Sequence, residues 1–359
     1  MPHPKDPLAP IFKPAIRSSV EVLIEAYRSG RKYTDEQFPK SREDFESFRR
    51  DVIENLQSTL GLESWVVRNP GGKGSELSDR FHFRLLETIE QHGIRMEVGA
   101  IEIPETGDAI PTVLCLPEAK EPRPGVCVFS GHSAHGLRDL TVDLESYQDG
   151  VATRLAQAGF VSIAIEKIDA GYLARDFGDG VDEPEIGTLR LAWGRPSRSH
   201  QLMACIAAAE ILAGHPQVDE SKIGATGVSL GGWLSIETAL LSDRIQAIAD
   251  FGRKTVNLVP QTDPAAFEGM RDICHIYPGM LSVCDRNLVA LACCPTPMLA
   301  GHGEKDRGSH REGPVHFRSL FEAQYGALGQ PDKYQYHIHG GADDMPADAV
   351  IRYFQRFLG

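Results

Sequence analysis

A serine flanked by glycines is the clearest candidate for chemistry in this chain. The stretch from Ile223 to Leu234 reads IGATGVSLGGWL, an apolar run that ends in Gly-x-Ser-x-Gly around Ser229. A turn that joins a strand directly to a helix strains the serine backbone and crowds the positions two residues away on either side. Gly227 and Gly231 relieve that crowding. The pattern predicts a nucleophile elbow that holds the Ser229 hydroxyl at a helix N-terminus, where negative charge is favoured.

Acyl transfer by a serine also needs donors for the oxyanion that forms in the transition state. The segment Ser130 to Gly136 reads SGHSAHG and follows a continuous apolar run. In folds with a nucleophile elbow, the loop after an earlier strand supplies one N–H of the oxyanion hole. His132 is our candidate for the first backbone N–H donor. The second is the N–H of Leu230, the residue after the nucleophile. The alternative is a plain turn whose histidines contact solvent.

The acid that would orient a catalytic base should follow a later strand. The run from Pro297 to Asp306 reads PMLAGHGEKD, an apolar segment that leaves into a loop. This spacing places the carboxylate of Asp306 at the carboxyl end of the strand. Glu304 is the competitor, but it lies closer to the strand and is expected to face a neighbour or solvent.

The base should be a histidine in the loop before the last helix. That loop reads HIHGGADDMP from His337 to Pro346, and the position that follows its two glycines holds Ala342. An alanine side chain cannot accept a proton. His339 is the nearest substitute, although a structural role for this histidine is the simpler interpretation.

These residues require a framework of alternating strands and helices. The apolar runs predict a strand pair, six further strands and intervening helices, which together indicate a mainly parallel sheet covered by helices on both faces. Predicted strands are 98–103, 111–116, 124–130, 160–165, 222–226, 245–251, 297–299 and 334–338. Predicted helices are 151–158, 201–212, 233–241, 315–325 and 347–358.

Residues 1–95 are interpreted as a helical segment that either packs on the main domain as an appendage, or caps the site or forms a dimer contact. Helical spacing covers 20–27 and 45–62, Ser41 with Asp44 resembles a helix start, and 83–92 is a further helical candidate. The catalytic domain is expected to span 96–359, with pocket-forming insertions near 169–198 and 252–287. Side chains in these insertions that could bind substrate, or simply pack, are Arg190, Trp193, Arg195, His275 and Tyr277.

Composition excludes several classes of protein. The net charge of -13 argues against a nucleic-acid partner, because phosphate would be repelled. The seven cysteines have no metal-binding spacing, and several lie in apolar runs, so we expect reduced thiols in a cytoplasmic protein. The first residues lack the apolar core of a signal peptide, and no apolar run approaches the roughly 20 residues that span a bilayer.

From about Arg95 to Leu358 the sequence resembles the bacterial α/β-hydrolases related to dienelactone hydrolase and acetyl-xylan esterase, in the form that carries an N-terminal helical extension. The resemblance rests on SGHS at 130–133, where the family has His-Gly-His-Gly, and on YQD at 147–149, HPQVD at 215–219, KIG at 222–224, YPGM at 277–280, GEKD at 303–306 and GG at 340–341. It implies the α/β-hydrolase fold and a serine esterase with the triad of Ser229, Asp306 and a histidine at position 342.

Two departures from the family pattern affect this interpretation. The oxyanion loop has serine at two family positions, which changes side chains but keeps the N–H donor. Where the family has Gly-Gly-His, this chain has Ala342. The chain is then a deliberate His-to-Ala variant of an active enzyme, or a site in which His339 or another histidine has taken over, or a naturally silent ligand binder. We rank the three interpretations in this order, because the intact elbow and the intact Asp306 argue against a site that lost its activity long ago.

The sequence therefore predicts a serine hydrolase that acts on a carbonyl compound, most simply a carboxylic ester, through an acyl-enzyme on Ser229. C–C bond hydrolysis and acyl transfer on the same triad remain alternatives, as does a silent ligand-binding homologue. No metal and no organic cofactor is implied. The expected partner is a small-molecule substrate, with neither nucleic acid nor membrane, and a homodimer is an open option.

Overall fold

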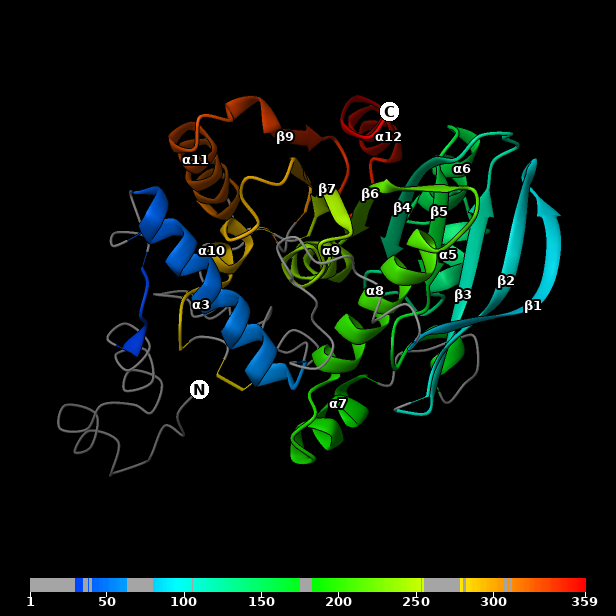
Figure 1. The fold of residues 1–359 in the computed structure, drawn as a ribbon, viewed down its shortest axis with the longest axis horizontal. Coiled ribbons are helices and arrows are strands. Elements are labelled where there is room, and N and C mark those ends of the chain that lie inside the picture. The colour runs from blue at the N-terminus through cyan, green and yellow to red at the C-terminus, as the bar shows by residue number, and fades with distance from the viewer. Residues whose placement is uncertain are drawn as a thin grey trace, which may run out of the picture.

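A twisted sheet of nine strands organises the computed structural model (Figure 1), which describes residues 30–34, 38, 41–62, 80–104, 106–174, 183–252, 254, 278–279, 282–306, 309 and 312–359. The strands are β1 (His82–Gln91), β2 (Ile94–Ile103), β3 (Asp108–Leu116), β4 (Arg123–Phe129), β5 (Val161–Ile165), β6 (Val218–Val228), β7 (Ile245–Phe251), β8 (Met298–Gly303) and β9 (Tyr334–His339). Their order is β1-β2-β3-β5-β4-β6-β7-β8-β9. The pairs from β5 to β9 are parallel, and those among β1, β2, β3 and β5 are antiparallel. The expected mainly parallel sheet is confirmed.

Helices cover both faces of this sheet. One buried cluster joins the sheet to α3 (Arg42–Leu60), α8 (Ser197–Ala213), α9 (Leu230–Leu241), α10 (Arg286–Leu291) and α11 (Glu312–Ala327). The opposite cluster joins it to α5 (Leu137–Thr141), α6 (Val151–Gln157) and α12 (Ala347–Phe357). The helix α7 (Glu183–Ala192) precedes α8, and short 3₁₀ turns lie at Gly171–Leu173 and Pro331–Lys333. Because both faces are covered, central strands such as Val126–Phe129 are apolar throughout and almost fully buried.

The segment 83–92, predicted as a helix, forms the edge strand β1 instead. Its apolar residues fall at 83, 85, 86 and 89, a spacing that a helix can accommodate, yet the chain reverses at His92 and Gly93 with φ of 52° and 75°. A two-residue loop with positive φ at both positions is the preferred hairpin connection, and here it pairs Gln91 with Ile94. The helical prediction missed this turn. Residues expected in a separate helical segment therefore extend the main sheet.

The N-terminal helix α3 belongs to the same core as the sheet. Ser41 caps it by accepting the N–H of Asp44, as the sequence predicted, and Gly61 ends it in the left-handed conformation. The side chains of Phe45, Phe48, Val52, Leu56 and Leu60 are each at most 4% exposed and join the cluster of α8 and α9. The predicted helix at 20–27 lies outside the described residues.

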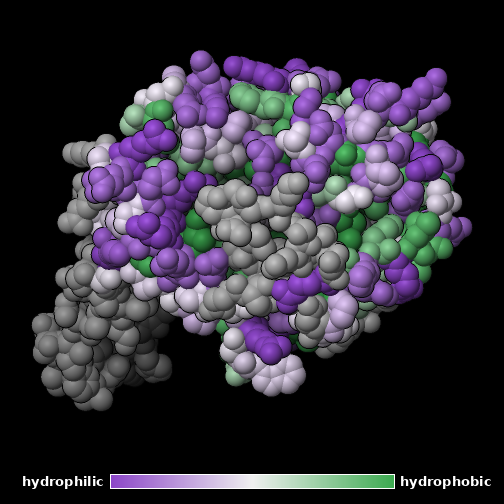
Figure 2. Space-filling view, in the orientation of Figure 1, coloured by the Kyte–Doolittle hydropathy of each residue, from purple (hydrophilic) through white to green (hydrophobic). Residues whose placement is uncertain are grey.

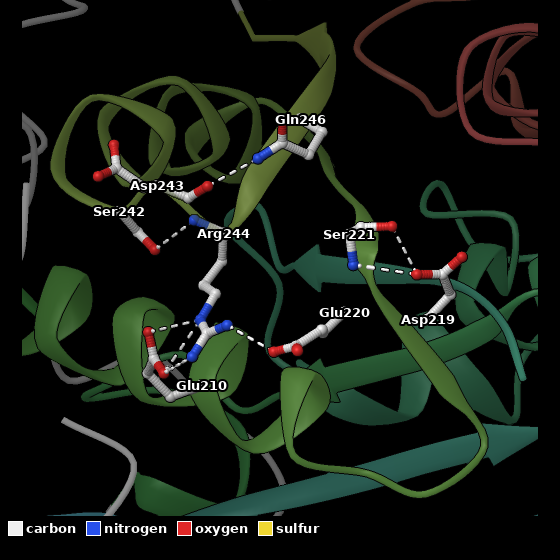
Figure 3. Close-up of polar contacts among 8 residues, drawn as sticks. All are labelled: Glu210, Asp219, Glu220, Ser221, Ser242, Asp243, Arg244 and Gln246. Atoms are coloured by element: carbon white, nitrogen blue, oxygen red, sulfur yellow. Dashed lines mark hydrogen bonds and ion pairs between the residues drawn. The ribbon is translucent and has the colours of Figure 1, made fainter. Parts of the chain in front are cut away.

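At the amino edge of the parallel strands, one arginine joins three elements (Figure 3). Arg244, just before β7, reaches Glu210 on α8 at 3.1 Å and Glu220 on β6 at 2.9 Å. The guanidinium binds both carboxylate oxygens of Glu210, whose side chain is only 6% exposed. Such two-point contacts fix direction as well as distance. This cluster therefore fastens α8 to the sheet at the end opposite the candidate site.

Six of the seven cysteines are described, and all six are buried and free. Burial raises the pKa of the Cys115 thiol to about 12, as expected for an inert core residue. The expectation of reduced thiols holds for these six, while Cys274 lies outside the described residues. Within the described part of the chain, no helix is both long enough and apolar enough to cross a bilayer.

Candidate active site

The nucleophile elbow has the geometry that the sequence predicts. Ser229 lies between the end of β6 and the start of α9 with φ 55° and ψ -120°, a conformation that costs energy for any residue with a side chain. A Cβ on Gly227 would lie 2.3 Å from a backbone carbon of Gly231, and one on Gly231 would lie 2.0 Å from the carbonyl oxygen of Phe129. Glycine is therefore required at both flanking positions. The N–H of Ser229 donates to the carbonyl of Phe251 and anchors the turn to the next strand.

The predicted oxyanion loop packs directly against this serine. A Cβ on Gly131 would lie 3.2 Å from Cβ of Ser229 and 2.5 Å from the hydroxyl of Tyr147. The Gly131 N–H donates to the side-chain oxygen of Gln148 at 2.8 Å, and Tyr147 donates to the carbonyl oxygen of His132 at 2.9 Å. Two side chains therefore hold the loop in place. Tyr147 and Gln148 were noticed in the sequence only as part of the family resemblance, because nothing in their spacing revealed these bonds.

The first turn of α9 supplies the other predicted donor. Leu230 opens the helix directly after Ser229, so its N–H is one of the amides that have no partner within the helix ladder. Its side chain is fully buried, which fixes the start of the helix. The placement is compatible with an oxyanion site between Leu230 and His132. That these two amides hold an oxyanion stays a prediction.

Asp306 follows β8 as expected, and a serine that the sequence reading overlooked holds it. The hydroxyl of Ser309 donates to Oδ2 of Asp306 at 2.6 Å, and in turn accepts the N–H of Lys254 at 3.1 Å. Glu304, the competitor, is exposed. A half-buried carboxylate with a directed donor suits the orientation of a base better than an exposed carboxylate does.

Position 342 lies against the loop of the acid. A Cβ on Gly303 would be 2.0 Å from the carbonyl oxygen of Ala342, and the N–H of Lys305 donates to the carbonyl of Gly341 at 2.9 Å. The loop that carries Ala342 is also bonded to the segment that follows the predicted oxyanion loop. The N–H of Met345 donates to the carbonyl of Tyr147 at 2.8 Å. The Ala342 side chain is exposed. The loops that carry Asp306 and Ala342 therefore lie side by side, and the predicted base position carries a methyl group.

His339 is held by other partners. It ends β9 opposite Gly303 in the register, and its ring centroid lies 6.0 Å from that of Phe251. Its Nδ1 accepts the N–H of Gly341 at 3.3 Å and lies 3.8 Å from a carboxylate oxygen of Asp344. Neither contact directs the ring to Ser229. These bonds favour the structural interpretation of His339 over a role as replacement base.

A fully buried lysine beside the site escaped the sequence analysis. The ammonium of Lys254 donates to Asp250 at 2.7 Å and to the carbonyl of Gly252, and it lies 5.0 Å from the ring centroid of Phe317. Burial lowers the pKa of Lys254, and Asp250 acts in the opposite direction. A Cβ on Gly252 would lie 2.8 Å from the carbonyl oxygen of Ser229. The pair of Lys254 and Asp250 therefore stabilises the backbone that follows β7, next to Ser229. No sequence signal revealed the pair, because a spacing of four residues is also that of an ordinary surface ion pair.

The residues singled out for substrate binding are not brought together as one group. Arg190 forms a two-point pair with Asp169, at 3.2 and 3.3 Å, so its charge is largely matched. Trp193 is 78% exposed, and Arg195 lines a separate cavity that is described below. His275 and Tyr277 lie outside the described residues. Within the described ranges, no group of three or more histidine, cysteine, aspartate or glutamate side chains could hold a metal ion.

The sheet order and the sharp turn at Ser229 after β6 match the α/β-hydrolase fold. Comparison with protein families agrees: residues 110–268 match the family model described as the Dienelactone hydrolase family. That match covers the sheet centre, the oxyanion loop and the elbow, whereas α3 and β1 and the loops of Asp306 and Ala342 lie outside it. A search of curated proteins found no match to this sequence.

Solved structures share the fold across nearly the whole chain. A protein from Bacteroides fragilis, assigned as an acetyl xylan esterase, has a TM-score of 0.74 at 13% identity, and the match covers 96% of each chain. A glucuronoyl esterase from Solibacter usitatus has a TM-score of 0.64 at 13% identity, over 91% of this chain and 97% of that one. Acetyl Xylan Esterase 1 from Thermoanaerobacterium has a TM-score of 0.54 at 15% identity, over 88% and 94%. These identities show a common fold.

Proposed function

We propose that this chain is a serine hydrolase of the carboxylic ester class whose base position, 342, is occupied by alanine. The observation that carries the proposal is the strained Ser229 turn packed against the Gly131 loop. Such strain persists only where the surroundings maintain it, and it is typical of a nucleophile at an oxyanion site. Ser229 itself is 7% exposed. The family match over 110–268 and the esterases that share the fold support the same reaction class.

The proposed reaction assigns one task to each group. The Ser229 oxygen attacks the carbonyl carbon of the ester and loses its proton to a base at position 342. Asp306 orients that base, and the amides of His132 and Leu230 stabilise the negative charge on the carbonyl oxygen. The alcohol leaves with the proton, and water then releases the acid from Ser229. In the chain as it stands Ala342 cannot transfer the proton, so the chain should bind substrate better than it turns it over.

A second candidate function has one observation in its favour. Ala342 stands in an otherwise assembled site, which is what a ligand-binding homologue without turnover would show. C–C bond hydrolysis and acyl transfer use the same groups and differ in pocket shape and water access. For all of these functions we propose a small-molecule partner rather than nucleic acid or a membrane. We also propose a cytoplasmic location and keep the homodimer as an option.

The test restores the base. Ala342→His should raise hydrolysis of a p-nitrophenyl ester panel by several orders of magnitude, because loss of a triad histidine costs about 10⁶ in turnover in another serine hydrolase. A serine-directed phosphonate should then label Ser229, as identified by peptide mass. The matched control is Ala342→His with Ser229→Ala, which should lose both signals. No gain in hydrolysis, together with retained ligand binding, would favour the silent binder.

A further inference from the structure

A cavity of about 520 Å³ lies between the N-terminal helix and the start of α8, apart from the residues assigned to catalysis. Its lining residues are Leu60, Gly61, Leu62, Arg80, Thr106, Gly194, Arg195, Ser199, His200 and Met203. The hydroxyl of Ser199 donates to the carbonyl of Leu60 at 2.7 Å and joins two of its walls. The volume falls within the range of roughly 300–1,000 Å³ that is usual for small-molecule sites.

The cavity lies at the same edge of the sheet as the nucleophile. Register places Phe129 of β4 level with Ile165 and with Gly227, so the carboxyl ends of β4, β5 and β6 are aligned. β3 runs antiparallel to β5, which brings its first residues and the preceding Thr106 to this same edge. α8 precedes the parallel strand β6, so it begins here as well (Figure 1).

The lining combines positive charge with an apolar wall. Arg80, Arg195 and His200 contribute the cationic or ionisable groups, and none of the described lining residues is acidic. Leu60, Leu62 and Met203 supply apolar surface. This concentration stands out in a chain with a net charge of -13. The face of the molecule in Figure 2 is largely hydrophilic, with hydrophobic residues scattered among the hydrophilic ones.

His200 is a half-buried polar residue of this cavity. Its Nδ1 is out of contact with solvent and has no hydrogen-bond partner in the described part of the chain. Burial lowers the pKa of His200, as do the charges of Arg190 and Arg195, while Asp108 and Asp169 act in the opposite direction. Asp169 is already engaged by Arg190 and by the Ser197 hydroxyl at 3.2 Å. The empty cavity therefore favours neutral His200, and a bound anion would favour the protonated form.

We propose that this cavity binds an amphiphilic organic anion, with its charged head between Arg80, Arg195 and His200 and its apolar body against Leu60, Leu62 and Met203. Arginine and histidine are the side chains that best complement a carboxylate or phosphate head, and the apolar wall excludes a purely inorganic ion as the preferred ligand. The site is independent of the ester-hydrolase proposal. Leu60 and Leu62 of its apolar wall, together with Arg80, belong to the N-terminal part of the chain, outside the 110–268 family match.

Calorimetric titration of the full chain with octanoate, octyl phosphate and octanol tests the site. We expect octanoate or octyl phosphate to bind and octanol to bind at least about tenfold more weakly, because one charge-assisted hydrogen bond contributes about 1.5–3 kcal/mol. Which of the two anions binds more tightly identifies the head group. Failure of both anions to bind, or equal binding of octanol, would overturn the proposal.

Variants separate this site from the surface in general. Arg195→Gln and the double variant Arg195→Gln with His200→Gln should each weaken anion binding, by about tenfold or more in the double variant. The control Arg318→Gln removes an exposed arginine that pairs with Glu322 and should leave binding unchanged. Unchanged binding in folded Arg195→Gln and double variants would overturn the proposal, and thermal melting confirms folding.

The pH dependence gives an independent readout. An anion favours protonated His200, so affinity should rise as pH falls from about 8 to about 6 in the unsubstituted chain and stay flat in His200→Gln. The charged groups that act on His200 are Arg190, Arg195, Asp108 and Asp169. A pH dependence retained in folded His200→Gln would contradict the assigned role. None of these measurements uses catalysis, so their outcome does not depend on that of the Ala342→His experiment.

Discussion

At the scale of single residues, the chemistry of this chain depends on short contacts around one strained serine. The glycines that flank Ser229 are required by distances of 2.0–2.3 Å to a hypothetical Cβ, and these were predictable from the pentapeptide. The contacts that hold the other groups were not predictable. Gln148 on Gly131 and Tyr147 on His132 link residues that are 17 and 15 positions apart, a separation that follows no motif. A motif fixes a local backbone shape, whereas these bonds depend on how loops meet in space.

The Ser309 contact leads to a prediction about positioning. In the Ala342→His background, Ser309→Ala should lower kcat/KM for a p-nitrophenyl ester about tenfold, because a hydrogen bond to a charged group contributes about 1.5–3 kcal/mol. The loss should appear in kcat with little change in KM, since Ser309 contacts the acid and not the proposed substrate position.

Steady-state kinetics on purified variants measure this effect. Ser319→Ala is the control, because its hydroxyl donates only to the carbonyl of Val315 on the exposed side of α11. If Ser309→Ala keeps full kcat/KM, Ser309 does not position the acid. Thermal melting of both variants provides the folding control. If both lose the same stability while only Ser309→Ala loses kcat/KM, the kinetic loss does not come from unfolding.

At the scale of elements, α3 shows how an N-terminal addition becomes part of the core. The sequence predicted its helix, its Ser41 cap and its apolar face, because all three are local signals. It did not predict what that face covers. The same local reasoning failed for β1, where a helical spacing of apolar residues concealed a hairpin turn at His92 and Gly93. Short apolar segments fit both periods, and the partner strand decides between them.

Burial of the α3 face predicts its contribution to stability. Phe48 is 0% exposed and packs edge-on against Tyr33 with ring centroids 5.0 Å apart. Phe48→Ala should reduce the free energy of unfolding by about 3–5 kcal/mol, through lost transfer energy and the cavity that remains.

Denaturant unfolding followed by circular dichroism measures this loss. Arg50→Ala, at an exposed position on the same helix, is the control and should change stability by less than about 0.5 kcal/mol. A Phe48→Ala loss as small as that of the control would mean that α3 is an appendage, as a separate 1–95 segment would require.

At the scale of the whole molecule, charge restricts the partners more firmly than the fold does. With a net charge of -13 the chain should not bind a short DNA duplex even at low salt, because nucleic-acid binding gains its free energy from neutralised phosphates. Fluorescence anisotropy of labelled duplex tests this, with a basic DNA-binding protein as positive control. Salt-dependent binding would contradict the expectation.

The sequence predicted the whole-molecule architecture well because alternating apolar runs and helices leave few arrangements open. The strand positions from 98 onward, the elbow and the acid loop all agree with the structure, and the order of the sheet follows from the fold class. The cavity at Arg195 and His200 was not predictable. It is assembled from α3, the loop before β3 and the start of α8, so no stretch of sequence contains it.

The pairing of β3 with β5, while β4 lies on the far side of β5, has a consequence for the order in which the chain assembles. The hairpins β1–β2 and β2–β3 connect neighbours in sequence, so their loops close at little entropic cost. β4 acquires its two partners only once β5 and then β6 have been made, almost a hundred residues after it. During synthesis the antiparallel ribbon of β1, β2 and β3 should therefore form early. The apolar strand β4 stays without a partner until β5 and β6 have been made, and a chaperone would be most useful during this period.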